Sequence, residues 1–169
     1  MRHSPSPWAE RPRDQASLFN PAFLALLIER SAYGHRERSG LGMSWPLVFI
    51  ALPAVLHKET REALPKAVNS SMAVWTAGHP LLVAALPDRA SALTPYVREA
   101  LLFALGHRLV RLEGDRLLPS KLAKPPIDQP WREPTEDFRA CATKASFFGR
   151  WCAVSGLPAT IFALWGVRP

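Results

Sequence analysis

The sequence predicts a mainly α-helical protein that carries a winged-helix-like helix-turn-helix and one short β-hairpin. Three observations lead to this fold class. Apolar residues recur at helical spacing in several segments. Capping residues and prolines precede these segments, and glycines follow them. Two alternating runs flank a glycine-centred turn at Glu113-Gly114-Asp115, a pattern typical of a hairpin.

The domain organisation follows from proline and charge content. Residues 1–16 combine prolines with alternating charges around Trp8, and we predict a flexible N-terminal arm there. The remaining residues, 17–169, suffice for a single compact helical and winged-helix domain. Within this domain, the five prolines of the segment 119–134 predict an extended strap.

The first predicted helix has clear signals at both ends. Asn20 is a good N-cap, and Pro21 suits the first helical position. An apolar stripe follows, formed by Phe19, Ala22, Phe23, Leu26 and Leu27. Gly34 is expected to end this helix.

The second predicted helix is followed by an abrupt change in character. Ser44 should cap this helix, which continues to Leu56 and is apolar on all sides, so we expect it to be buried all round. Pro53 should bend or break it. Residues 57–62, with the sequence HKETRE, are then densely charged. We interpret them as the solvated corner of a helix-turn-helix, in which Thr60 caps a helix of about one turn.

The segment SSMAVWTAG is predicted as the third helix of this motif, opened by Asn69 or Ser70 and closed by Gly78. A long helix should follow within residues 88–105, and Pro95 either kinks it or marks its true start. The hairpin RLVRLEGDRLLP comes directly after these helices. It would therefore form the wing of a winged-helix domain.

Two helices are predicted near the end of the sequence. Thr135 should cap the first, whose apolar residues have 3-4-3-4 spacing: Phe138, Cys141, Ala145, Phe148 and Cys152. A short helix from Pro158 to Gly166 should fold back on it, so that one apolar unit contains Phe138, Phe148, Trp151, Phe162 and Trp165. The two cysteines lie in one predicted helix, too far apart for a disulfide.

The sequence offers little support for catalysis. It contains no phosphate-binding loop with a lysine, and its five histidines are scattered. His57 near Glu59 and Glu62 is the one candidate for an acid–base site, but the end of one helix followed by the solvated start of the next explains these residues more simply. Cys141 and Cys152 are candidate nucleophiles, but cysteines on an apolar seam are more often small core residues. We therefore expect no enzyme, no cofactor and no metal site. Unpaired cysteines without a signal peptide indicate the cytoplasm, and no apolar run is long enough to cross a membrane.

A formal net charge of +7 permits contact with an acidic partner such as DNA. Basic residues outnumber acidic ones in and after the predicted hairpin. The candidate contacts to DNA phosphates are Arg108, Arg111, Arg116, Lys121 and Lys124. A hairpin that is merely exposed and solvated is consistent with the same residues.

Four segments in series carry a resemblance to a known family: SLFNPAFLALLI, LPAVLHKETREALP, YVREALLFALGH and KASFFGRWCAVSGLPATIFALWGVRP. From about Ser17 to Pro169, the chain resembles the middle component of bacterial three-component ABC systems, which are similar to Lamassu-type defences. The resemblance implies an accessory subunit of an SMC- or Rad50-like ABC ATPase complex with an effector, commonly a nuclease, that acts against phage or plasmid DNA. ATP, metal and double-stranded DNA would be engaged mainly through the ATPase.

The alternative hypothesis is a stand-alone winged-helix DNA-binding regulator. Its recognition helix would be SSMAVWTAG, which has no Arg, Lys or Gln to read bases. We therefore favour the subunit. Its candidate partner surface consists of the charged corner and the aromatic C-terminal segment, through His57, Lys58, Glu59, Arg61 and Trp165.

Overall fold

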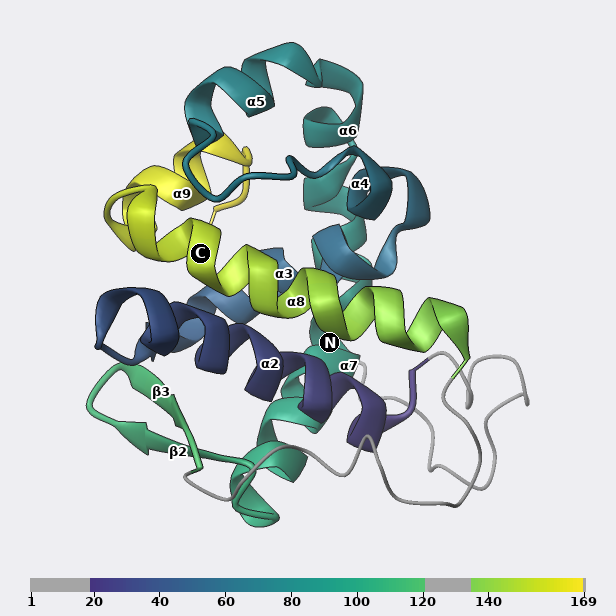
Figure 1. Ribbon diagram of the computed structural model, residues 1–169. Coiled ribbons are helices and arrows are strands. Elements are labelled where there is room, and N and C mark those ends of the chain that lie inside the picture. Colours follow the sequence, from purple (N-terminus) through teal and green to yellow (C-terminus); the bar gives the residue numbers. More distant parts are fainter. Residues whose placement is uncertain (1–18, 121–134, 169) are drawn as a thin grey trace.

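The computed structural model describes residues 19–120 and 135–168, and within them the protein is mainly helical, as predicted (Figure 1). The arm 1–16 and most of the predicted strap lie outside the described residues. The elements in chain order are α2 (Pro21–Ser39), β1 (Met43–Ser44), the 3₁₀ helix η2 (Trp45–Leu47), α3 (Val48–Leu56), α4 (Lys58–Ala63), α5 (Met72–Gly78), α6 (Pro80–Ala84), α7 (Leu86–Gly106), β2 (Val110–Glu113), β3 (Arg116–Pro119), α8 (Glu136–Val154) and α9 (Pro158–Leu164).

Helices α2 and α8 run side by side in the same direction at the centre of the molecule (Figure 1). Their backbones almost touch. A Cβ atom added at Gly34 would lie 2.0 Å from the carbonyl oxygen of Ser146, and one added at Gly149 would lie 1.9 Å from that of Ser31. The sequence predicts that Gly34 ends α2, but this glycine lies inside the helix and permits the close approach of α8. The helix continues to Ser39 and ends at Gly40, whose φ is 74°.

Helix α3 is the buried helix that the sequence predicts. Pro53 lies inside it without ending it, and seven of its residues are buried. The helical segment begins where predicted, because Ser44 is the N-cap residue of η2 and α3 continues directly from η2, although the Ser44 side chain makes no capping hydrogen bond. Met43 and Ser44 also form strand β1. This strand pairs with β3, with Met43 opposite Leu117. The predicted hairpin β2–β3 is confirmed, and β1 extends it to a three-stranded antiparallel sheet of order β1-β3-β2.

The helix-turn-helix differs from the prediction. Helices α4 and α5 are connected by residues 64–71 and not by a tight turn. Helix α5 also lies at the opposite end of the molecule from the hairpin, which packs on α2 and α7 (Figure 1). The structure therefore does not confirm a winged helix built from α3, α4 and α5. Helix α6 was not predicted, and α7 continues through Pro95 without a break.

Aromatic side chains join α5, α8 and α9. The ring of Trp165 lies 5.2 Å from that of Trp75 and 5.7 Å from that of Phe148. Trp151 packs edge-on against Trp75, with 5.7 Å between the ring centres. The predicted apolar unit thus forms around these rings, but Phe138 lies apart from it and packs on Phe23 of α2 at 4.9 Å. Cys141 and Cys152 are free and buried.

Candidate functional site

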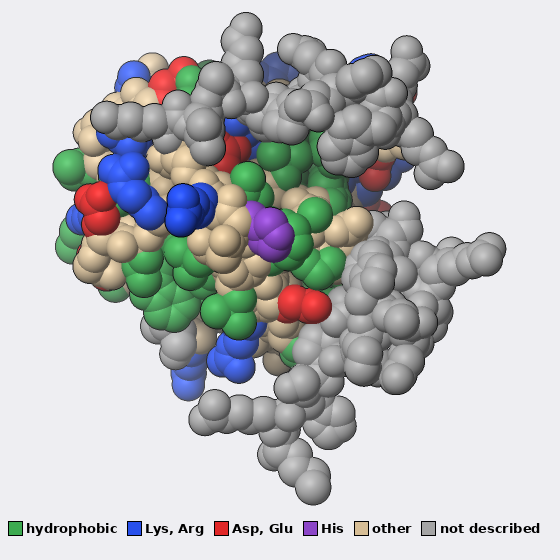
Figure 2. All heavy atoms as spheres, turned by 90° about the horizontal axis from the view of Figure 1, so that it is seen from below, with side chains coloured by type: hydrophobic (Ala, Val, Ile, Leu, Met, Phe, Trp, Pro, Cys, Tyr) green, Lys and Arg blue, Asp and Glu red, His purple; other side chains and the backbone are tan. Residues whose placement is uncertain are grey.

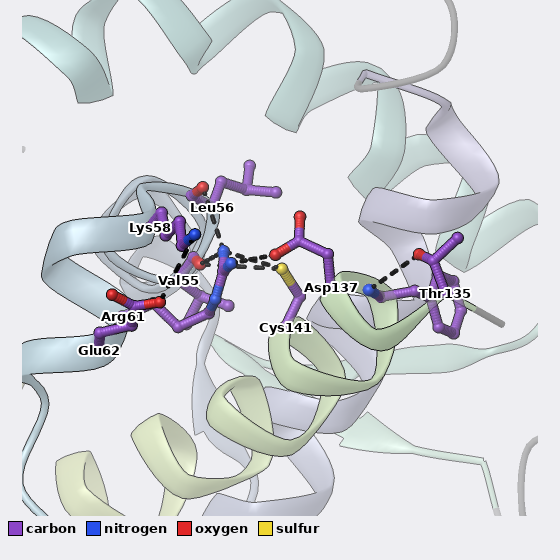
Figure 3. A network of polar contacts seen from close by, with 9 residues as sticks. Val55, Leu56, Lys58, Arg61, Glu62, Thr135, Asp137 and Cys141 are labelled. Atoms are coloured by element: carbon purple, nitrogen blue, oxygen red, sulfur yellow. Dashed lines mark hydrogen bonds and ion pairs between the residues drawn. The ribbon is translucent and has the colours of Figure 1, made fainter.

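The charged segment 57–62 forms a corner between α3 and α8, and its central residue is Arg61 (Figure 3). The Arg61 side chain is only 5% exposed. It donates to the carbonyl oxygens of Val55 at 2.9 Å and Leu56 at 3.3 Å, which are the last carbonyls of α3. It also contacts the sulfur of Cys141 at 3.2 Å and pairs with Asp137, both on α8. One guanidinium thus satisfies the end of one helix and ties it to another.

The chain leaves α3 through His57, whose backbone is extended and which caps α4. The backbone N–H of Thr60 donates to Nδ1 of His57 at 3.3 Å, and the Thr60 hydroxyl lies 2.9 Å from the same nitrogen. His57 and not Thr60 is therefore the N-cap. Burial and the positive charge of Arg89 lower the pKa of His57. A neutral imidazole suits this role, because Nδ1 must be unprotonated to accept a hydrogen bond.

Three of the five candidate partner residues lie at the surface of this corner. Lys58 and Glu59 are exposed and His57 is half-buried. Lys58 also lines an open groove of about 780 Å³ between α4 and α8, whose charged side chains are of both signs. Arg61 and Trp165 do not belong to a surface: Arg61 is buried by its hydrogen bonds, and the Trp165 ring is fully enclosed by other aromatic rings. The structure therefore corrects these two predictions: Arg61 and Trp165 stabilise the fold and do not form a partner surface.

The hairpin carries the predicted basic residues, but part of their charge is already compensated. Arg111 pairs with Glu113 at 2.6 Å. Arg116 donates to the carbonyl oxygen of Gly42 at 2.9 Å and lies 4.0 Å from Asp115. Arg108 is exposed, with a φ of 57°. Lys121 and Lys124 lie outside the described residues. The structure thus places three of the five candidate phosphate contacts at the hairpin and its base.

The groups that were considered for catalysis serve the fold. His57 caps α4, and Glu62 lies 3.9 Å from Lys58 as an exposed helical pair. Burial raises the pKa of both thiols, Cys141 and Cys152, so neither is a ready nucleophile. Within residues 19–120 and 135–168, no group of three or more His, Cys, Asp or Glu side chains is placed to hold a metal ion.

Sequence reasoning missed an exposed apolar surface on α5 and α6, which we call the α5–α6 face. Every residue of α6 is apolar, yet none is buried. Leu81 of α6 is 84% exposed, and Val74 of α5 is 72% exposed. The signal in the sequence is a run without Asp, Glu, Lys or Arg over residues 67–87. A helix that is apolar all round is normally buried, so this face is suited to contact with another molecule.

Hydrogen bonds hold the α5–α6 face in place. Arg89 of α7 donates to the carbonyl oxygen of Leu82 at 2.9 Å and to Thr60 Oγ1 at 3.0 Å. The indole of Trp75 donates to the Ala63 carbonyl at 2.9 Å, and that of Trp151 to the Ser70 carbonyl at 2.6 Å. Both ends of the segment that leads into α5 are therefore fixed. A surface that is already ordered loses little entropy on binding.

In the part of the chain that the structure describes, no single helix combines the length and apolarity needed to cross a membrane. By length and composition alone, α8 and α9 together pass the same test, but they are bent by 114°. The apolar residues of α8 are largely buried inside the protein.

Comparison with known protein families gives a match over most of the chain. A family model described as ABC-three component (ABC-3C) system Middle Component 3 matches residues 8–169. No curated protein and no solved structure matches the chain.

Proposed function

The chain belongs to the ABC-3C Middle Component 3 family, and from this premise we propose that it is a non-catalytic accessory subunit of an SMC- or Rad50-like ABC ATPase complex. The complex would also contain an effector component, for which a nuclease is the expected activity. It would act in defence against phage or plasmid DNA. ATP and its metal ion would bind to the ATPase and not to this subunit. The observation that carries the proposal is the family match over nearly the whole chain.

The α5–α6 face supports association with another component. Leaving an apolar helix such as α6 in water is unfavourable by roughly 25 cal/mol for each Å² of apolar surface. A partner that covers Leu81 and Val74 would recover this free energy. The like net charge of two copies, +7 each, disfavours self-association as the way to cover the face. We therefore assign the face to the ATPase component.

Co-purification tests this function. The tagged chain is co-expressed with the ATPase encoded beside it, and the amount of ATPase retained on the affinity resin is measured. We expect the wild-type chain to retain the ATPase and the double variant Val74→Glu/Leu81→Glu to lose at least tenfold in affinity, because two charges would be desolvated in the interface. Leu41→Glu, at a residue that is 57% exposed elsewhere, is the matched control.

Activity supplies the second measurement. The isolated chain should hydrolyse no ATP, because it has no phosphate-binding loop. Cells that carry the whole system should lose protection against phage when Val74 and Leu81 are both replaced by Glu, and keep it with Leu41→Glu. Absence of any complex between the wild-type chain and the ATPase or effector would overturn the proposed function.

A further inference from the structure

A second apolar feature shares no lining residue with the α5–α6 face. An open groove of about 830 Å³ runs between η2 and α3 on one wall, α7 on the other, and the segment after α9 at one end. We call it the α7 groove. Its lining includes Trp45, Phe49, Leu101, Leu102, Phe162 and Val167.

The chemistry of the α7 groove is simple. Trp45 and Phe49 pack edge to face at 6.1 Å and form an aromatic wall. Leu102 is 70% exposed and Trp45 is 38% exposed, although both are large apolar side chains. Among the residues that the structure describes, the charged ones that line the groove are two arginines, Arg98 and Arg168, and both are exposed. The groove thus combines an apolar surface with positive charge alone.

We propose that the α7 groove binds an amphipathic helix whose apolar side chains enter the groove and whose acidic side chains pair with Arg98 and Arg168. The helix would belong to another component of the same system, so this inference rests on the proposed function. Apolar grooves that accept one face of a helix are a common mode of recognition. Trp and Arg, both present here, are the residue types that contribute most to such interfaces.

Other occupants fit less well. A small molecule is normally enclosed over most of its surface, whereas this groove opens to solvent along exposed Leu102 and Trp45. A second copy of this chain brings a net charge of +7, which Arg98 and Arg168 would repel. A partner helix with acidic residues meets both the apolar and the electrostatic requirement.

The groove is already formed in the free chain. The backbone N–H of Trp45 donates to the Asp115 carbonyl at 3.0 Å, which fixes η2 against the hairpin turn. Phe162 of α9, which also lines the groove, is buried in the main core. Binding would therefore require little reorganisation of the wall residues.

Overlapping fluorescein-labelled peptides that cover the ATPase and effector sequences test the proposal directly. Their binding to the isolated chain is followed by fluorescence anisotropy. We expect an acidic amphipathic segment to bind, and Arg98→Glu/Arg168→Glu to weaken it at least tenfold, through like-charge repulsion. Leu102→Glu should weaken it similarly, by placing a charge on the apolar wall. Arg139→Glu, at an exposed residue of α8 outside the groove, is the matched control and should change little.

The outcomes separate this inference from the proposed function. If the full-length components co-purify equally well with wild type, Arg98→Glu/Arg168→Glu and Leu102→Glu, and no peptide responds to these changes, the groove is not the binding site although the function stands. If neither component co-purifies with the wild-type chain, the proposed function fails first. Binding of a neutral or basic peptide in the groove would also overturn the inference, because Arg98 and Arg168 would then not select for acidic side chains.

Discussion

A single buried guanidinium holds the corner at α4. Replacing Arg61 by Ala leaves the Val55 and Leu56 carbonyls without their donor and removes the tie to α8. Loss of a charged donor to buried acceptors costs on the order of 2–3 kcal/mol of unfolding free energy. Chemical denaturation of Arg61→Ala measures this loss.

Asp137 provides the control for Arg61. Its side chain is 72% exposed, so Asp137→Asn should cost less than about 1 kcal/mol. Arg61→Lys should lose about as much unfolding free energy as Arg61→Ala, because an ammonium group lacks the planar fork that reaches two carbonyls and a carboxylate together. Equal losses in Arg61→Ala and Asp137→Asn would show that the ion pair, and not the helix end, is the important contact.

His57 should make stability depend on pH. Its pKa is lowered in the folded protein, by burial and by Arg89, so the folded state binds fewer protons than the unfolded state. The stability that the neutral ring contributes is therefore present above about pH 6.5, the unfolded value, and is lost as pH falls through the lower folded pKa. The free energy of unfolding should decrease from about pH 7 to about pH 5.

His57→Asn isolates this effect. Asn is a good N-cap that does not titrate, so the variant should keep α4 and show a shallower loss of stability on acidification. Part of the pH dependence should remain, because burial also lowers the pKa of His35. An unchanged pH profile in His57→Asn would mean that the His57 ring does not act as the cap in solution.

At the scale of elements, the packing of α2 on α8 depends on two glycines. A methyl group at Gly34 or Gly149 would overlap a backbone carbonyl of the facing helix. Backbone cannot move aside as a side chain can, so we expect Gly34→Ala and Gly149→Ala each to destabilise the protein by about 3 kcal/mol or more. Thermal melting of each variant checks this expectation.

Gly78 is the matched control for these glycines. It ends α5, and a Cβ atom added there meets nothing within 4 Å. Gly78→Ala should leave stability unchanged or raise it by up to about 1 kcal/mol, because Ala favours the helix. A comparable loss in all three variants would mean that the close approach of α2 and α8 is not the reason why Gly34 and Gly149 are needed.

Helix α9 has only seven residues and depends on Trp165 for its attachment. Trp165→Ala would empty a site among Trp75, Trp151 and Phe148 and should cost about 3–5 kcal/mol. Trp165→Phe should cost much less, because no hydrogen bond of the indole is lost: its N–H has no partner among the described residues. A stable Trp165→Ala variant would mean that α9 is dispensable for folding.

The elements were predictable where their signals are local. Asn20 and Thr135 cap helices as predicted, and Gly114 forms the hairpin turn. The role of Gly34 was not predictable, because it depends on a helix that lies more than 100 residues further along the chain. For the same reason, the sequence predicts a surface position for Arg61: only the packed structure shows which charges of a dense run face inward.

At the scale of the whole molecule, the charge on the hairpin allows direct DNA contact within the complex. Any such contact should be weak, independent of sequence and sensitive to salt. Arg108→Ala/Arg111→Ala should weaken binding equally on all sequences. The slope of log affinity against log salt concentration should become shallower by less than the loss of two phosphate contacts would give, because Arg111 is already paired with Glu113. Anisotropy with random duplexes at several salt concentrations measures this, and tight binding to one particular site would favour the regulator.

The pairing of α2 with α8 also determines when during translation the protein can reach its native state. Helix α2 leaves the ribosome about 100 residues before α8 begins, which corresponds to roughly 5–20 s of synthesis. Throughout that interval the side of α2 that packs on α8 has no permanent partner, and nascent chains with exposed apolar surface are the usual clients of chaperones. Chains stalled before residue 136 should therefore stay protease-sensitive along α2, whereas release of α8 should protect it.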